Sequence, residues 1–420
     1  MRKISKISLV AAVAVAGFST ANAQPLEEAI KNVDVSGSVV YRYDNADNSL
    51  VSGLNDRTDR NRYKIGLNLS SKVNDYVKFN SRFLVGEGDE NYSWATTDAK
   101  ENGGDGAASV SLSQAYFGFT AIPNTVVNIG KQGLTTPYTV AVDINGNEQA
   151  GTGILALSTF GPITAGAGYF NNQNLNVNAN EVNSSLKIAG GTSFTPGVTS
   201  LKLDGGSDLY VATVQGDLDF VKLEAWYAGL KDSLNSYTFA ATSNLDLAEN
   251  AKIGLEARYV YLKLDSDLVG NTLERDNSMM RFAVDGKFSI VNARLAYTKT
   301  DKDGGLTAFD QDAKNTSLGW NITSNGVADA DYFQAALGVD ILDNLNFTAH
   351  YGNLSSDKQT GRTVLLDNVK QQEVYGQLTY KMSKNLSTYL RYGNYEQKVK
   401  STGVKSVDQD MGRLQVAYTF

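Results

Sequence analysis

Residues Asp410–Phe420, at the end of the chain, read Asp-Met-Gly-Arg-Leu-Gln-Val-Ala-Tyr-Thr-Phe, and this stretch decides the fold. The side chains of an extended strand alternate between its two faces. One face here is polar and carries Arg413, whereas the other is apolar and ends on the last residue of the chain. The apolar face comprises Leu414, Val416, Tyr418 and Phe420. Such a strand belongs either to the edge of a soluble sheet or to a barrel whose apolar side faces lipid.

The same alternation recurs along the chain and predicts eighteen strands. They lie at 33–43, 61–73, 76–86, 109–120, 125–132, 152–160, 162–170, 208–217, 220–229, 236–247, 251–263, 278–288, 291–300, 331–341, 345–354, 371–381, 386–396 and 410–420. Short turns and long connections alternate between them. An even strand count with short turns at one end and long loops at the other is a property of bacterial outer-membrane barrels. We therefore expect an all-β protein, a single 18-stranded antiparallel transmembrane β-barrel over residues 33–420.

The composition supports this class and excludes others. The 420 residues include 38 Lys and Arg against 45 Asp and Glu, a net charge of −7. This acidic balance argues against a protein that binds nucleic acid, which would carry an excess of basic residues. Cysteine is absent, so a small disulfide-stapled fold is excluded. Beyond the first 23 residues no segment offers the roughly 20 consecutive apolar residues of a spanning helix. A closed barrel is then the form in which this chain crosses a membrane, because a barrel pairs all its backbone N–H and C=O groups between neighbouring strands.

The first 23 residues have the organisation of a secretory signal peptide. Three basic residues precede an apolar run at 7–18, and residues 21–23, Ala-Asn-Ala, have the small-x-small form of a cleavage site. Residues 24–32 then form a short periplasmic segment ahead of the first strand. We expect export with a cleaved signal peptide and localisation in the outer membrane of a Gram-negative bacterium.

The face opposite the apolar one should line the barrel interior, and it is rich in basic residues. The predicted pore-lining residues on this face are Arg42, Lys64, Lys78, Arg82, Arg258, Arg281, Arg294, Arg391 and Arg413. Clear acidic residues on the same face are fewer, so the negative charge concentrates in loops and turns. Barrels of 16 to 18 strands leave an aqueous channel. The pattern therefore indicates a water-filled path for small hydrophilic solutes and ions.

The connection at 133–151 is the predicted constriction. If it folds into the barrel, Asp143 and Glu148 face the arginine-rich wall and set up a transverse field that orders polar solutes. The alternative is an ordinary external loop. Asp143, Asn145 and Glu148 are also calcium candidates, because carboxylate and amide oxygens in a Gly-containing turn suit that ion. Their spacing differs from that of an EF-hand, and no cofactor is required by the sequence.

Several motifs resemble those of the major outer membrane porin family of Campylobacter and its relatives. The resemblance is carried by Pro-Leu-Glu-Glu-Ala-Ile-Lys-Asn-Val-Asp-Val-Ser-Gly at 25–37, Tyr41-Arg42-Tyr43, Gln114-Ala115-Tyr116, Gly130-Lys131-Gln132, Thr136-Pro137-Tyr138-Thr139 and Gly151-Thr152-Gly153-Ile154. It implies an 18-stranded homotrimeric porin, general diffusion with mild cation preference, and calcium association near the constriction. By motif it also implies that Lys131 and the 136–154 loop are constriction elements.

Other functional classes leave weaker signals. A substrate-specific channel would need an ordered aromatic or basic track, and a structural or adhesive barrel would use its long acidic loops; both stay open as alternatives. A barrel enzyme would need a nucleophile and base or a carboxylate and histidine in one site. The chain has one histidine, His350, and no Gly-x-Ser-x-Gly motif, so we expect no enzymatic activity and a wall position for His350.

Overall fold

The computed structural model of the protein describes residues 33–50, 57–98, 108–176, 203–269, 273–360, 364 and 366–420. The predicted signal peptide, 1–23, and the predicted periplasmic segment, 24–32, lie outside these described residues.

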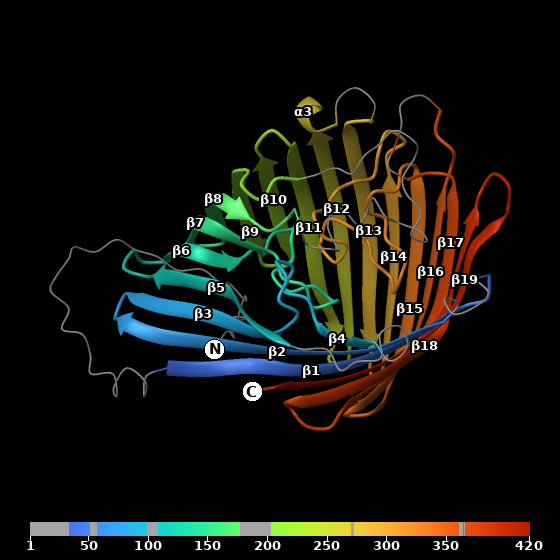
Figure 1. The fold of residues 1–420 in the computed structure, drawn as a ribbon, viewed down its shortest axis with the longest axis horizontal. Coiled ribbons are helices and arrows are strands. Elements are labelled where there is room, and N and C mark those ends of the chain that lie inside the picture. Colours follow the sequence, from blue (N-terminus) through green and yellow to red (C-terminus); the bar gives the residue numbers. More distant parts are fainter. Residues whose placement is uncertain are drawn as a thin grey trace.

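The predicted fold class is confirmed: the protein is a closed, 18-stranded antiparallel β-barrel (Figure 1). Every neighbouring pair in the ring is antiparallel. The strands of the ring are β1 (Val33–Asn48), β2 (Arg57–Asn74), β3 (Val77–Gly86), β5 (Ser109–Phe119), β6 (Thr125–Gly133), β7 (Ala150–Phe160), β8 (Ile163–Gln173), β9 (Leu209–Leu218), β10 (Val221–Leu230), β11 (Leu234–Ala248), β12 (Ala251–Leu264), β13 (Asp276–Phe288), β14 (Val291–Thr300), β15 (Ala330–Leu342), β16 (Leu345–Ser356), β17 (Val369–Lys381), β18 (Leu386–Val399) and β19 (Lys405–Thr419).

Two short elements lie in the connections. Strand β4 (Ala95–Asp98) pairs with β2 at Arg60–Tyr63, beyond the point where β3 ends, and the alternation pattern did not reveal it. Helix α3 (Ser266–Val269) follows β12. No helix among the described residues is long and apolar enough to span a bilayer.

The barrel closes where the last strand meets the first. β1 pairs with β19 from Ser38↔Thr419 to Asn48↔Gln409. The backbone N–H of Gly37 donates to the carbonyl of Phe420 at 2.9 Å, and that of Phe420 donates to the carbonyl of Gly37 at 3.1 Å. Figure 1 accordingly shows the C-terminus beside β1. Closure leaves no sheet edge with unpaired backbone groups, as a bilayer requires.

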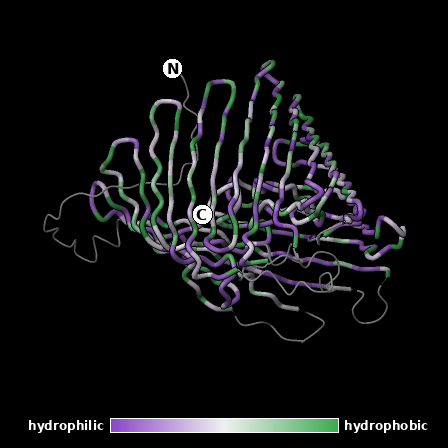
Figure 2. The backbone as a smooth tube through the Cα atoms, turned by 90° about the horizontal axis from the view of Figure 1, so that it is seen from above, coloured by the Kyte–Doolittle hydropathy of each residue, from purple (hydrophilic) through white to green (hydrophobic). Residues whose placement is uncertain are grey.

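The two faces of the wall differ in the way the alternation predicts. Large apolar side chains point outward and are exposed, among them Tyr41, Leu295, Leu414 and Phe420. Figure 2 shows the hydrophobic and hydrophilic colours changing along the strands. An exposed apolar belt of this kind is the lipid-facing surface of an outer-membrane barrel.

The interior is not polar throughout, although the sequence pattern predicts an inward face rich in basic residues. Leu134, Tyr138 and Phe309 come from two connections, and they are buried against apolar residues of β9 to β12 such as Leu209 and Leu262. A second apolar cluster joins Ile322 and Val327 to Leu354 and Met411. The inward connections therefore bring their own apolar side chains, which cover part of the wall and narrow the lumen.

Candidate constriction site inside the barrel

Two connections meet inside the barrel. We refer to residues 134–149 as the β6–β7 loop and to residues 301–329 as the β14–β15 loop. The N–H of Phe309 donates to the carbonyl of Tyr138 at 2.8 Å, and that of Asn315 donates to the carbonyl of Pro137 at 2.9 Å. The Tyr138 and Phe309 rings also pack with centroids 6.0 Å apart. In Figure 1 both connections run within the ring of strands.

A turn at Asp143–Gly146 forms the tip of the β6–β7 loop. The Asp143 carboxylate accepts from the N–H of Asn147 at 2.8 Å, and the N–H of Gly146 donates to the carbonyl of Asp143 at 2.9 Å. Gly146 has a φ of 83°, and a Cβ there would lie 2.0 Å from the indole nitrogen of Trp94. Glycine is therefore required for both the backbone conformation and the close approach of Trp94.

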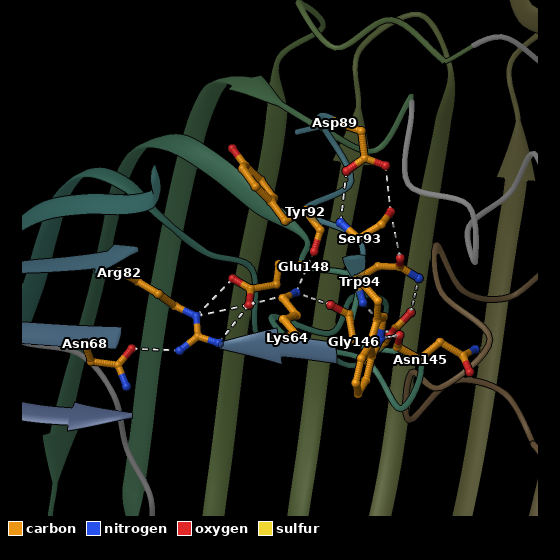
Figure 3. A network of polar contacts seen from close by, with 12 residues as sticks. Lys64, Asn68, Arg82, Asp89, Tyr92, Ser93, Trp94, Asn145, Gly146 and Glu148 are labelled. Carbon is orange, nitrogen blue, oxygen red and sulfur yellow. Dashed lines mark hydrogen bonds and ion pairs between the residues drawn. The ribbon is translucent and has the colours of Figure 1, made fainter. Parts of the chain in front are cut away.

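Glu148 holds the loop to the wall through ion pairs (Figure 3). Its carboxylate is 1% exposed and accepts from Arg82 Nη2 at 2.8 Å and Arg82 Nε at 3.0 Å, with Lys64 Nζ at 3.4 Å. Lys64 also donates to the carbonyls of Tyr92, at 2.5 Å, and Gly146. Two cations and a bidentate geometry offset the large cost of removing this carboxylate from water.

Arg42 of β1 contacts the loop tip from the other side. Its Nη2 donates to the carbonyl of Ile144 at 2.7 Å, and its guanidinium lies 4.7 Å from the centroid of the Trp94 ring. Trp94 in turn donates from its indole nitrogen to the carbonyl of Asn145. Arg42 and Trp94 thus fix the tip of the β6–β7 loop beside β1.

Asp143 faces the β14–β15 loop, and its charge also acts on Lys64 of the basic wall. Its carboxyl group lies close enough to that of Asp310 for the two charges to interact, and Asp312 accepts from the N–H of Ile144 at 2.9 Å. Burial, followed by the charge of Asp143, raises the pKa of Asp310 well above its usual value. Burial also raises the pKa of Asp312 to about 6. Three carboxyl groups therefore gather where the two loops meet.

Glu373 of β17 anchors the β14–β15 loop. It is 1% exposed and accepts from the backbone N–H groups of Trp320, Asn321 and Ile322 at 2.8, 2.8 and 3.3 Å. The Trp320 ring lies 5.0 Å from the guanidinium of Arg391 and 5.7 Å from that of Arg413. A carboxylate that accepts several backbone donors fixes a loop strongly.

Arg258 and Arg281 lie beneath the same loop with Glu256. The Glu256 carboxylate accepts from Arg258 Nε at 2.9 Å and from Arg281 Nη2 at 2.7 Å. Arg281 also donates to the carbonyls of Lys314, at 2.8 Å, and Thr316. Both arginines are buried, so they support the loop and do not line open water.

The structure brings together most of the predicted pore-lining residues, although around the loops and not along a bare wall. Lys78 and Arg294 lie apart from the loops: Lys78 is exposed on β3 near a short turn, and Arg294 pairs with Asp285 at 2.6 Å. Lys131 pairs across the ladder with Ala115 and Thr152, and its amine binds Tyr92, whose carbonyl accepts from Lys64. Lys131 thus meets the residues around Glu148 through Tyr92, and its place at the constriction stays a prediction.

The predicted calcium set is not assembled. The Glu148 oxygens are held by Arg82 and Lys64. Asn145 contributes its backbone carbonyl to Trp94, and Asp143 turns toward Asp310. Within the described ranges no group of three or more His, Asp or Glu side chains has the arrangement of a metal site.

The sequence analysis singles out the 133–151 connection and does not identify the β14–β15 loop as part of the site. That loop supplies Asp310, Asp312 and Trp320 to the site. The signal that could have revealed it is the apolar content of this connection, because a solvated loop has no need of buried side chains. These residues are Leu306, Phe309, Ile322 and Val327.

The closed ring, the apolar outer belt and the charged inward loops define a porin-like outer-membrane barrel. All 420 residues match the family described as Campylobacter major outer membrane protein, and the chain belongs to that family. None of the curated proteins matches the chain.

Solved barrels from Pseudomonas aeruginosa have a similar fold. OpdL superposes with a TM-score of 0.70 at 15% identity, covering 93% of this chain and 99% of that chain. OpdQ has a TM-score of 0.69 at 15% identity, with 93% and 99% covered. OprD has a TM-score of 0.66 at 16% identity, with 92% and 93% covered. At these identities the likeness concerns the fold.

Proposed function

We propose that the protein is a porin through which small hydrophilic solutes and ions diffuse passively, with mild cation preference. The observation that carries this proposal is the β6–β7 loop, held inside the barrel by the Glu148–Arg82–Lys64 ion pairs. A loop fixed within the lumen sets the cross-section of the water path while the barrel stays closed to lipid.

The charges of the site support the cation preference. Arg413 is paired with Asp44 at 2.5 Å, and Lys64 and Arg82 are paired with Glu148. Three carboxyl groups gather at the tips of the two loops. They belong to Asp143, Asp310 and Asp312. Charged groups at a narrow, weakly solvated passage select the sign of the ion that passes.

Planar-bilayer conductance in a KCl gradient tests this function. We expect large, stable steps and a reversal potential of modest cation preference. The double variant Asp143→Asn, Glu148→Gln should change step size or shift the reversal potential, because it alters both ends of the loop turn. Folded, heat-modifiable protein that gives no steps would disprove the channel and favour the structural or adhesive alternative.

A substrate-specific channel is the second candidate, and one cluster favours it. Arg391 lies 5.0 Å from the Trp320 and Tyr375 ring centroids and 5.4 Å from that of Tyr389. Such a basic and aromatic wall suits planar polar solutes. Liposome swelling separates the two functions: rates that depend on solute size alone support general diffusion, whereas one solute with saturable, faster uptake supports specificity.

We also propose that calcium binds between Asp143 and Asp310, in place of the set inferred from the sequence, with backbone oxygens or water completing its coordination where a third carboxylate is lacking. The fit rests on Asp310, whose carboxyl group is fully buried and whose Oδ2 has no hydrogen-bond partner. A bound divalent cation would supply positive charge to this cluster and join the two loops. EDTA should then lower the thermal stability of the protein, and added calcium should restore it; Asp310→Asn should remove both effects.

The remaining proposals concern export and assembly. We propose that the signal peptide is cleaved after Ala23, so mass spectrometry of the purified protein should show Gln24 as the first residue.

We propose a homotrimer, as the family resemblance implies. Small outward side chains on β7–β9 support a contact there, because they leave a groove of about 630 Å³ and allow close approach. Native mass spectrometry in detergent tests the trimer, and a monomer alone would contradict it.

A further inference from the structure

We propose a binding site for an amphipathic organic cation, an ammonium group on a flat apolar body, between the β6–β7 loop and the wall of β5–β10. It rests on the proposed channel function, since the solute reaches the site from the lumen. The site is a cavity of about 470 Å³. That volume lies in the range of small-molecule pockets, which are mostly apolar with a few placed polar groups.

The body of the cavity is apolar. The loop contributes Leu134 and Pro137, and the wall contributes side chains of β7 to β10: Leu155, Leu157, Phe170, Val211 and Trp226. These residues belong to an inner wall that the porin class usually keeps polar. An apolar recess that opens on a polar lumen retains the apolar part of a solute.

The charge of the cavity is set by Glu224. The charged residues that line it are Glu224 and Lys314, and the Lys314 Nζ lies 3.8 Å from the Glu224 Oε1. The Lys314 side chain is 65% exposed, whereas that of Glu224 is 16% exposed. An exposed lysine in a long ion pair is readily displaced, so the carboxylate is the fixed charge and an incoming ammonium can replace Lys314.

Trp226 orients both the carboxylate and the ligand. Its indole N–H donates to Glu224 Oε2 at 3.3 Å, which holds the carboxylate beside the ring. Its backbone carbonyl accepts from the Tyr138 hydroxyl at 3.3 Å, which ties this strand to the β6–β7 loop. A tryptophan face next to a carboxylate is a favourable environment for an ammonium group.

The other polar groups of the cavity are neutral. They are side chains such as Gln114, Asn128, Gln132, Thr213 and Gln215. Neutral amides and hydroxyls accept from an ammonium group without adding charge. The Glu224 carboxylate would repel an anionic solute of the same shape, so the site distinguishes cationic from anionic solutes by charge.

Tryptophan fluorescence of the folded protein in detergent tests the site. Three probes separate its elements: phenethylammonium, its anionic isostere 3-phenylpropionate, and tetramethylammonium, which lacks the apolar body. We expect a saturable emission change with phenethylammonium alone. Trp226→Phe should abolish the change, and Glu224→Gln, which keeps the acceptor for Trp226, should weaken phenethylammonium binding at least tenfold. Asp285→Asn, which removes an inner-wall carboxylate outside the cavity, should leave binding unaltered.

Equal responses to the ammonium and its anionic isostere, or binding unaffected by Glu224→Gln, would overturn the site. The same probes in planar bilayers should give brief current blockades with phenethylammonium that Glu224→Gln shortens. The two proposals fail separately. Conductance without ammonium binding would disprove the binding site but not the porin function. A saturable fluorescence change in protein that shows no conductance would disprove the porin function but not the binding site.

Discussion

Glu148 is the residue on which the inward position of the β6–β7 loop depends most. Replacing it with glutamine leaves Lys64 and Arg82 buried without a carboxylate. Breaking a buried pair in this way costs about 3–5 kcal/mol. We expect Glu148→Gln to unfold at a lower temperature, as followed by the heat-modifiable band in electrophoresis.

The matched control for Glu148→Gln is Asp75→Asn. Asp75 pairs with Lys72 at 2.6 Å in a turn, where both side chains are largely exposed. Exposed pairs contribute about 0–1 kcal/mol, so this variant should unfold near the wild-type temperature. Equal behaviour of the two variants would mean that the Glu148 pairs do not hold the loop.

The loop carboxyl groups make stability depend on pH. Burial raises the pKa of Asp312 to about 6 and that of Asp310 further, from the ordinary 3.8. Groups whose pKa is raised by folding stabilise the protein fully below the unfolded value and lose this contribution as the pH rises through the folded one. In EDTA, the wild type should therefore lose stability as the pH rises from about 4, with the Asp312 contribution lost by about pH 6 and that of Asp310 at higher pH. The double variant Asp310→Asn, Asp312→Asn should flatten this dependence in thermal unfolding, and an unchanged slope would assign it to other groups.

At the scale of elements, Glu373 is the strand residue that accepts three backbone N–H groups of the β14–β15 loop. Glu373→Gln keeps one acceptor oxygen and loses the negative charge. The hydrogen bonds from the N–H groups of Asn321 and Ile322 are therefore weakened or lost. Each buried donor left without a partner costs about 1–3 kcal/mol. We expect limited proteolysis to cut within 301–329 roughly ten times faster or more, since about 1.4 kcal/mol corresponds to tenfold.

Glu396→Gln controls for the same chemical change. Glu396 accepts from Lys405 at 2.6 Å in an ion pair that is partly exposed near the end of β18. Its ion-pair partners are Lys398 and Lys405, outside the β14–β15 loop, so cleavage within 301–329 should proceed at the wild-type rate. Faster cleavage in both variants would indicate general loosening of the barrel.

At the scale of the whole molecule, the seam between β1 and β19 closes the barrel. Deleting Phe420 removes its two backbone hydrogen bonds with Gly37 and its stacking on Tyr418, whose ring centroid is 5.9 Å away. Phe420→Ala removes the ring but keeps both backbone bonds. We expect the deletion to lower the yield of folded, heat-modifiable barrel more than the substitution does. Equal yields would mean that the ring, and not the backbone closure, is what matters.

Much of the fold follows from local pattern. The alternation in 33–43 or 410–420 is visible within a few residues, because the strand period is two and lipid selects one face. The extra strand β4 carries only four residues, which is too short for a period to be recognised. Lys131 is assigned by motif, and its contact with Tyr92 follows only from the structure.

The sequence by itself determined the strand order, the apolar outer belt, the closing terminal strand and the identity of Glu148 as a charged residue in a long connection. Only the tertiary structure decided that the β14–β15 loop enters the lumen, that Asp143 meets Asp310, and that Glu224 and Trp226 share a cavity with Lys314. The physical reason is range: alternation and turns act between near neighbours, whereas pairs such as Glu224 and Lys314 are brought together by closure of the ring and by the burial of loop side chains within it.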